Sequence, residues 1–176
     1  MTEPRWLAAD EQRAWRAFLL MHSRLAARLN RQLQAACGLS LADYEVLVHL
    51  SEAAGGRARP HELQRALDWE QSRLSHQLAR MRQRGLVTRE RCGEDRRGAH
   101  VLLTDAGRQA ITTAAPGHVE TVRRLFFDPL TEDQVAALHT LAGQVLARLD
   151  DDGAPGDPEA PRDEAPRDAG GSGRRP

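Results

Sequence analysis

The sequence has 176 residues, a length that fits one domain or one domain with a tail. Its 25 basic residues are all arginines and balance 25 acidic residues, so the formal net charge is zero. Hydrophobic residues make up 40% of the chain, yet no apolar run approaches the ~20 residues needed to span a bilayer. The N-terminus lacks a basic-then-apolar secretory signal. We therefore expect a cytoplasmic protein with no membrane partner.

Charge is distributed unevenly along this neutral chain. Residues 150–176 contain eight acidic residues and four arginines, a net charge of about −4. Residues 57–97 contain eleven arginines and six acidic residues, a net charge of about +5. Such a basic block is typical of a surface that binds a polyanion, although a solvated arginine-rich surface has the same composition.

Two helices are predicted before the basic block. Apolar residues recur at steps of three and four over 10–36, with Asp10 as N-cap and Gly38 as the stop signal. This apolar face comprises Trp15, Phe18, His22, Leu25, Leu29 and Leu33. A second helix begins at Ser40, with Asp43 in the capping-box position, and ends before the glycines at 55–56.

The basic block itself predicts two short helices and a β-hairpin. Pro60 suits the first turn of a helix over 60–67. A second helix over 70–84 places Leu74, Leu78 and Met81 inward and ends at Gly85. Two extended runs, 86–91 and 99–103, flank a glycine-bounded polar tip and indicate a hairpin.

Two further helices and a tail complete the chain. Thr104 caps a fifth helix, which we expect to be broken or bent near Pro116. A capping box at 131–134 opens a sixth helix that continues to Leu149. Residues 150–176 are acidic, rich in Pro and Gly, and lack large apolar side chains, so we expect this tail to be disordered.

Two short helices, a tight turn and a hairpin are the layout of a winged helix-turn-helix. The fold class is therefore mainly α (α+β). Such a pair of helices presents its second member, here 70–84, to the major groove of DNA. The polar side chains of this helix can reach base edges or phosphates. The expected DNA-binding residues on it are Gln71, Ser72, Arg73, Ser75, His76, Arg80 and Arg84.

Several short runs resemble the winged-helix core of the MarR family of transcriptional regulators. They are Leu63–Leu67, Ser72–His76, Arg84–Val87, Glu94–Gly98 and Leu103–Gly107. The resemblance covers roughly residues 10–149 and implies a MarR-like domain over 1–149. Within this domain, 57–104 would form the winged helix-turn-helix. Helices over 10–54 and 105–149 would form a dimerisation region.

The resemblance also implies how the protein acts. A homodimer would bind a palindromic operator in double-stranded DNA, with helix 70–84 in the major groove and wing 86–103 in the adjacent minor groove. The wing motif Asp-x-Arg corresponds to Asp95 and Arg97, so Arg97 would enter the minor groove while Asp95 holds it. A repressor is the expected class. Glu70 departs from the family, which often has Ser or Asp as the cap of this helix.

Three more residues are expected at the DNA. Arg96 on the hairpin tip points away from Arg97 and suits a phosphate contact. Ser40 and His61, at or near helix N-termini, are further phosphate candidates, although each is also a local cap or surface residue.

Regulation by a small aromatic effector is a second implication of the family resemblance. The residues expected to line such a pocket are Trp15, His22, Tyr44, Trp69 and His118, with simple core packing as the alternative. Two other interpretations stay open: a winged-helix protein-interaction module, and a redox-responsive regulator using Cys37 or Cys92. The two cysteines and unpaired histidines predict no metal site, and no cofactor or enzyme motif is present.

Overall fold

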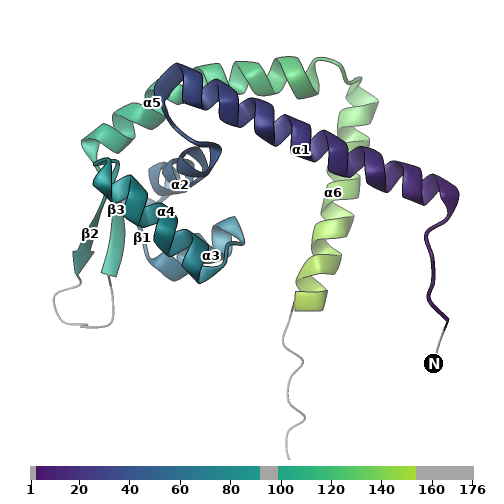
Figure 1. The fold of residues 1–176 in the computed structure, drawn as a ribbon, viewed down its shortest axis with the longest axis horizontal. Helices are drawn as coiled ribbons and strands as arrows, with labels where there is room; N and C mark the ends of the chain where they lie inside the picture. Colours follow the sequence, from purple (N-terminus) through teal and green to yellow (C-terminus); the bar gives the residue numbers. More distant parts are fainter. Residues whose placement is uncertain (1–2, 92–98, 154–176) are drawn as a thin grey trace, which may run out of the picture. The chain divides into compact units, whose positions relative to one another are not determined.

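The computed structural model describes residues 3–91 and 99–153 of the chain (Figure 1). Within them the protein is mainly helical with one small sheet, which confirms the predicted fold class. The elements in chain order are α1 (Ala9–Cys37), α2 (Leu41–Glu52), a 3₁₀ turn (Ala54–Gly56), β1 (Arg57–Ala58), α3 (Pro60–Leu67), α4 (Gln71–Gln83), β2 (Val87–Arg91), β3 (Ala99–Leu103), α5 (Asp105–Val122), a π-helical turn (Arg123–Phe127) and α6 (Glu132–Gly153).

The chain divides into two units between Leu130 and Thr131. The first unit holds every element from α1 to the π-helical turn, and the described part of the second is α6. In the first unit, α1 packs along α5, and α2 lies between this pair and the α3–α4 lobe (Figure 1). No helix of the described residues is long and apolar enough to cross a membrane.

One apolar core holds the first unit together. Burying a Leu or Val side chain contributes about 1.5–3 kcal/mol each, so this core is the main source of its stability. Helix α2 supplies the centre, because three of its apolar side chains have no exposed surface. The buried aliphatic and methionine side chains are Leu33, Leu39, Val46, Leu47, Leu50, Ala58, Leu63, Leu74, Met81, Leu86, Val87, Val101, Ile111 and Ala114.

Most helix ends form as the sequence predicts. Gly38 ends α1 in the left-handed conformation at φ 68°. The Ser40 hydroxyl accepts the Asp43 N–H, and the Asp43 carboxylate accepts the Ser40 N–H, which completes the expected capping box. The Thr104 hydroxyl accepts the Gly107 N–H at the start of α5. Thr131 and Gln134 cap the N-terminus of α6 in the same reciprocal way.

Four predicted boundaries differ from the structure. Helix α1 begins at Ala9, because the Glu11 carboxylate accepts the Ala8 N–H, and Asp10 lies in the first turn rather than at the N-cap. Helix α4 begins at Gln71 and ends at Gln83, and Glu70 precedes it without a side-chain cap bond. Helix α6 continues to Gly153, past the predicted end at Leu149, since extending a formed helix is far easier than nucleating one.

Helix α5 runs without a break through Pro116, so of the two predicted outcomes, a break or a bend, the break does not occur. A proline in a helix removes the N–H that would bond to the carbonyl four residues earlier. Here that carbonyl belongs to Thr112, and both residues are exposed, so solvent can satisfy it. The irregularity occurs later, at the π-helical turn Arg123–Phe127.

The sheet has three antiparallel strands in the order β1–β3–β2. In the hairpin, Val87 pairs with Leu103 and Arg91 pairs with Ala99, which confirms the two predicted strands. The short strand β1 adds to the other side of β3, with Arg57 opposite Leu102 and Ala58 opposite Val101. The hairpin is therefore joined to the segment that leads into α3.

Candidate nucleic-acid interface

The turn between α3 and α4 fixes the geometry of the helix-turn-helix. Asp68 ends α3 at φ 50°, a left-handed conformation that Asp adopts more readily than most residues. The Trp69 N–H donates to the Gln64 carbonyl at 3.1 Å, and the Trp69 side chain is only 7% exposed. The buried indole anchors the turn in the core and holds the start of α4 against α3.

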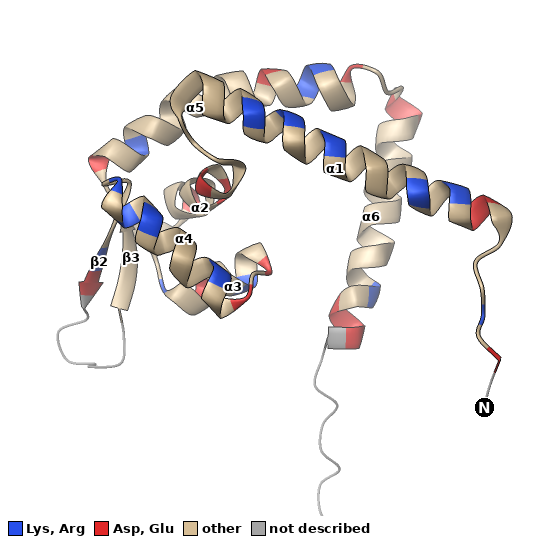
Figure 2. Cartoon of the chain, in the orientation of Figure 1, with Lys and Arg blue, Asp and Glu red and all other residues tan. Residues whose placement is uncertain are grey.

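Helix α4 has an inner apolar face and a polar exterior. Leu74, Gln77 and Met81 are buried, whereas the other positions are exposed except for half-buried Leu78. Basic positions recur along its surface (Figure 2). Six of the residues expected to bind DNA are exposed on this helix: Gln71, Ser72, Arg73, Ser75, His76 and Arg80.

Arg73 is ordered by its neighbours. Its guanidinium lies over the Trp69 ring, with 4.2 Å between Cζ and the ring centroid. Glu45 on α2 interacts electrostatically with this arginine. Burial raises the pKa of the Glu45 carboxyl, and the charges of Arg73 and then His49 lower it to a smaller extent. The guanidinium of Arg73 therefore lies on a buried aromatic ring, although Arg73 itself is exposed.

A groove of about 620 Å³ lies between α4, the start of α3 and the hairpin. Basic and polar side chains line it beside an apolar floor, so it suits a phosphate-bearing chain. His61, Gln71 and Ser75 were expected at the interface from sequence, and all three line this groove. The other polar side chains along it are Arg59, Gln64, Arg82, Thr88 and Arg89.

Sequence reasoning did not single out Arg59, Gln64, Arg82 or Arg89. The three arginines among them were counted in the basic block, but the net charge of the block does not indicate which arginines share a surface. A sequence signal exists for Arg82 alone: the step of four and three from Ser75 through Ala79 to Arg82 places these residues on one side of α4, whereas Arg59, Gln64 and Arg89 come from other elements.

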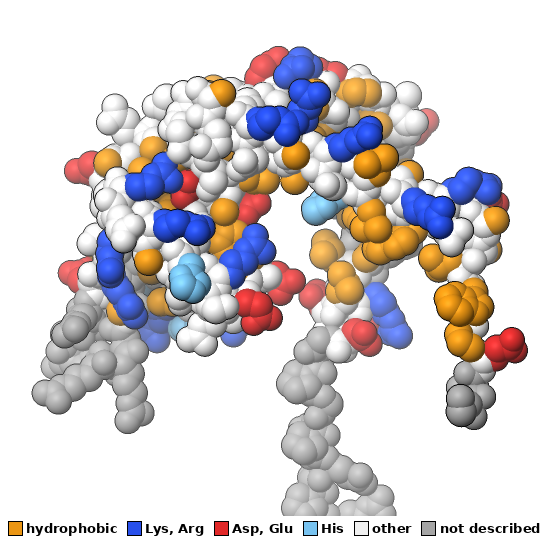
Figure 3. All heavy atoms as spheres, in the orientation of Figure 1, with side chains coloured by type: hydrophobic (Ala, Val, Ile, Leu, Met, Phe, Trp, Pro, Cys, Tyr) orange, Lys and Arg blue, Asp and Glu red, His pale blue; other side chains and the backbone are white. Residues whose placement is uncertain are grey.

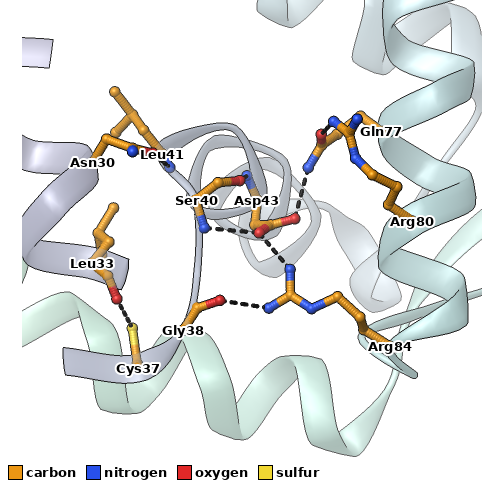
Figure 4. A network of polar contacts seen from close by, with 10 residues as sticks. All are labelled: Asn30, Leu33, Cys37, Gly38, Ser40, Leu41, Asp43, Gln77, Arg80 and Arg84. Carbon is orange, nitrogen blue, oxygen red and sulfur yellow. Dashed lines mark hydrogen bonds and ion pairs between the residues drawn. The ribbon is translucent and has the colours of Figure 1, made fainter. Parts of the chain in front are cut away.

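Arg84 and Ser40, both expected at the DNA, are engaged within the protein instead, while Arg80 stays exposed and donates to Gln77 on the same helix. Arg84 forms an ion pair with Asp43 at 2.7 Å and donates a second hydrogen bond to the Gly38 carbonyl at 2.8 Å (Figure 4). The Ser40 hydroxyl is used by the capping box of α2. The wing residues Asp95, Arg96 and Arg97 lie outside the described residues.

The expected effector residues fall into three groups. Tyr44 and His118 face each other with 4.2 Å between ring centroids. Trp15 and His22 both stack on Phe18 along α1, at 5.7 and 6.3 Å. Trp69 belongs to the helix-turn-helix core beneath Arg73. Only the first group joins different helices of the first unit.

Two buried polar side-chain atoms of the described residues are unsatisfied, and one of them belongs to His118. His118 Nδ1 and Gln32 Oε1 are buried without a hydrogen-bond partner. Burial lowers the pKa of His118, and burial, followed by the charge of Glu52, raises the pKa of Tyr44. The Cys37 thiol donates to the Leu33 carbonyl at 3.2 Å, while Cys92 lies outside the described residues.

Comparison with known families and proteins agrees with this geometry. The sequence profile of the MarR family matches residues 38–98, from the end of α1 to the hairpin. The HTH-type transcriptional regulator PecS of Dickeya dadantii is 30% identical over 112 residues, which are 63% of this chain and 67% of PecS.

Solved structures extend the similarity over most of the chain. AbsC, a MarR family transcriptional regulator from Streptomyces coelicolor, is 41% identical with a TM-score of 0.78, covering 83% of this chain and 98% of AbsC. Sco3205 from the same organism, solved in complex with DNA, is 40% identical with a TM-score of 0.78, covering 82% and 94%. A mutant of Escherichia coli MarR, complexed with operator DNA, is 27% identical with a TM-score of 0.68, covering 74% and 91%.

Proposed function

The chain belongs to the MarR family of transcriptional regulators, and we propose that it acts as a homodimer that binds a palindromic operator. In each subunit α4 enters the major groove, and the β2–β3 hairpin lies along the adjacent minor groove. The protein is a regulator of transcription, not an enzyme. We further propose that it represses its target genes.

The observation that carries this proposal is the exposed donor face of α4 beside the basic groove. Side chains with hydrogen-bond donors distinguish base pairs in the major groove, and arginines beside them neutralise phosphates. Sco3205 and Escherichia coli MarR have been solved with DNA, which supports the same use of this fold here.

The exposed residues divide into two roles. Arg73 and His76 would contact base edges, together with Gln71, Ser72 and Ser75. Arg82 and Arg89, which line the groove, would contact phosphates, with Arg80 and His61 as further contacts. Arg97 would enter the minor groove, held by Asp95, while Arg96 meets phosphate; these three roles come from the sequence motif alone.

Exposed apolar side chains support the dimer. Five apolar residues of α1 expose roughly half of their surface: Trp15, Phe18, Leu19, Leu20 and Met21. Helix α6 exposes Leu141, Val145, Leu146 and Leu149 by more than half. Orange side chains lie on the surface of both helices (Figure 3). Faces of this kind are costly in water and are typically covered in permanent dimers.

We also propose release from DNA by a small aromatic effector. The Tyr44–His118 contact is the element best suited to bind it, because it combines two rings with a buried, unpartnered ring nitrogen. Trp15, His22 and Trp69 are weaker candidates, since the first two lie on the exposed face of α1 and the third fills the core.

Selection of duplexes from a random pool tests the DNA-binding proposal. The wild-type protein should enrich a palindrome, and light scattering of the complex should give two chains per duplex. Replacing Arg73 or His76 with Ala should reduce preference for the palindrome by about 1–3 kcal/mol per base contact. Arg82→Ala should instead weaken all duplexes alike and make the salt dependence shallower by about one unit.

Arg31→Ala provides a matched control. Arg31 is exposed on α1, so its substitution removes one positive charge, as the other variants do, but at a position away from α4. It should leave sequence preference unchanged. A wild-type protein that enriches no duplex would contradict the proposal and favour a protein-interaction module. In contrast, if Arg73→Ala lowered the affinity for every duplex equally, Arg73 would be assigned to a phosphate contact rather than to a base contact.

A further inference from the structure

Asp43 is a buried carboxylate on which two helices converge. It lies in the first turn of α2 and is 2% exposed. One carboxylate oxygen accepts Gln77 Nε2 from α4 at 2.7 Å. The other accepts the Ser40 N–H at 2.8 Å and Arg84 Nη1 at 2.7 Å. A buried charge is costly unless it is paired and hydrogen-bonded, so each partner of Asp43 matters.

Arg84 extends this contact to a third helix (Figure 4). While Nη1 binds Asp43, Nη2 donates to the carbonyl of Gly38, the residue that ends α1. A single guanidinium thus joins the end of α1, the start of α2 and the end of α4. Gln77 adds a second link between α4 and α2 through its hydrogen bond to Asp43, and its amide oxygen accepts a hydrogen bond from Arg80 on the same helix. We call Asp43, Gln77 and Arg84 the carboxylate clamp.

We propose that Asp43 and Arg84 are positioning residues for operator recognition, with Arg84 acting through Asp43 rather than by contacting phosphate. This inference rests on the proposed function and specifies how α4 is held for it. It also changes the role expected for Arg84, which the sequence placed among the DNA contacts.

The physical reason lies in the difference between apolar and polar contacts. Leu74 and Met81 bury α4 in the core, but apolar burial is non-directional and tolerates small rotations of a helix. Charge-assisted hydrogen bonds are directional and short. The clamp therefore fixes the rotation and tilt of α4, on which base contacts depend because they need donor–acceptor distances of about 2.7–3.2 Å.

Four variants separate positioning from direct contact: Asp43→Asn, Arg84→Gln, the double variant, and Arg84→Lys. Arg82→Gln serves as the reference for a phosphate contact, because Arg82 lies on the same helix, is exposed and lines the groove. Affinity is measured for the selected palindrome and for a scrambled duplex of equal length, each over a range of salt concentrations. Thermal unfolding followed by circular dichroism establishes that each variant is folded at the assay temperature.

We expect Asp43→Asn and Arg84→Gln each to lower affinity for the palindrome about tenfold. The double variant should be no weaker than the weaker-binding single variant, because both remove the same link. Affinity for the scrambled duplex and the salt slope should stay at wild-type values. Arg84→Lys keeps the charge beside Asp43 and should recover part of the affinity.

A direct phosphate contact gives a different pattern. Arg84→Gln would then match Arg82→Gln, weakening both duplexes and making the salt slope shallower by about one unit, while Asp43→Asn would not weaken binding. That result, or full affinity in Arg84→Gln, overturns the inference alone. If Asp43→Asn is unfolded, the contrast between Arg84→Gln, Arg84→Lys and Arg82→Gln decides. A wild-type protein that selects no palindrome overturns the proposed function and this inference with it.

Discussion

The guanidinium carbon of Arg73 lies 4.2 Å from the centre of the Trp69 ring, so a residue on the outer face of α4 rests on a residue of the core. Trp69 is 7% exposed, while Arg73 is exposed. The arrangement restricts the rotamers of a long side chain before any ligand is present. It thereby lowers the conformational entropy that Arg73 would lose on contacting a base.

Replacing Trp69 with Leu tests this relationship. Leu keeps an apolar side chain in the core but removes the ring beneath Arg73. We expect operator affinity to fall by about 0.5–1 kcal/mol, the usual size of an exposed cation–π interaction. In an Arg73→Ala background the same change should have no further effect on binding. Additive losses in titrations of the four proteins would show that Trp69 acts independently of Arg73.

Gly107 in the first turn of α5 should not tolerate a side chain. A Cβ there would lie 2.1 Å from the Leu86 carbonyl oxygen and 2.8 Å from a Leu103 methyl carbon. Gly107→Ala should therefore lower the free energy of unfolding by at least about 2 kcal/mol, measured by chemical denaturation.

Gly117→Ala is the matched control on the same helix. Its Cβ would meet only the flexible end of Gln32, at 3.2 Å, so we expect a change within about 1 kcal/mol. Equal losses in the two variants would mean that the contact with the Leu86 carbonyl oxygen does not decide the effect, since Ala has a higher helix propensity than Gly.

Local signals explain why so many helix ends could be predicted. The capping hydrogen bonds of Ser40, Thr104 and Gly38 join residues no more than four positions apart, so a short stretch of sequence is enough to predict them. No break occurs at Pro116, because the effect of this proline depends on whether water reaches the carbonyl of Thr112, which only the packing of α5 determines.

His118 should make stability depend on pH. Burial lowers its pKa, so the folded state binds a proton less readily than the unfolded chain. Stability should therefore be unaffected above the unfolded pKa of about 6.5 and should fall as the pH decreases below it. His118→Gln should flatten this part of the curve of unfolding free energy against pH. At pH 8, where the ring is neutral in both states, His118→Gln should bring no gain in the free energy of unfolding. If the dependence of unfolding free energy on pH below about 6.5 stayed unchanged in the variant, His118 would be excluded as its cause.

Charges on the apolar faces should separate the dimer. Val145 is 51% exposed on α6. In the proposed dimer, Val145→Asp would place a charge in an apolar interface, and we expect light scattering at micromolar concentration to show mainly monomer. Palindrome affinity should fall with it. Thr140→Asp, which is on the opposite side of the same helix, should remain dimeric. A wild-type mass of one chain would refute the dimer itself.

The candidate interface could be predicted only in part from the sequence. The amphipathic pattern identified the outer residues of α4, since three-residue and four-residue spacing determines which side chains share a face. Arg84 fits the same pattern, yet its partner Asp43 is 41 positions away, and no local rule connects them. Arg89 and Arg59 reach the groove through strand pairing and the entry to α3, which are also long-range features.

The position of β3 between β1 and β2 has a mechanical consequence. The hairpin follows α4 through Gly85 and Leu86, and β3 is also hydrogen-bonded to β1, which leads directly into α3. Helix α4 and the hairpin strands are therefore connected twice, through Gly85 and Leu86 and through the β1–β3 pairing, and we expect them to move as one rigid body. Binding to a duplex then requires no hinge motion between α4 and the hairpin. The distance between these two DNA-contacting elements is therefore set before the protein binds.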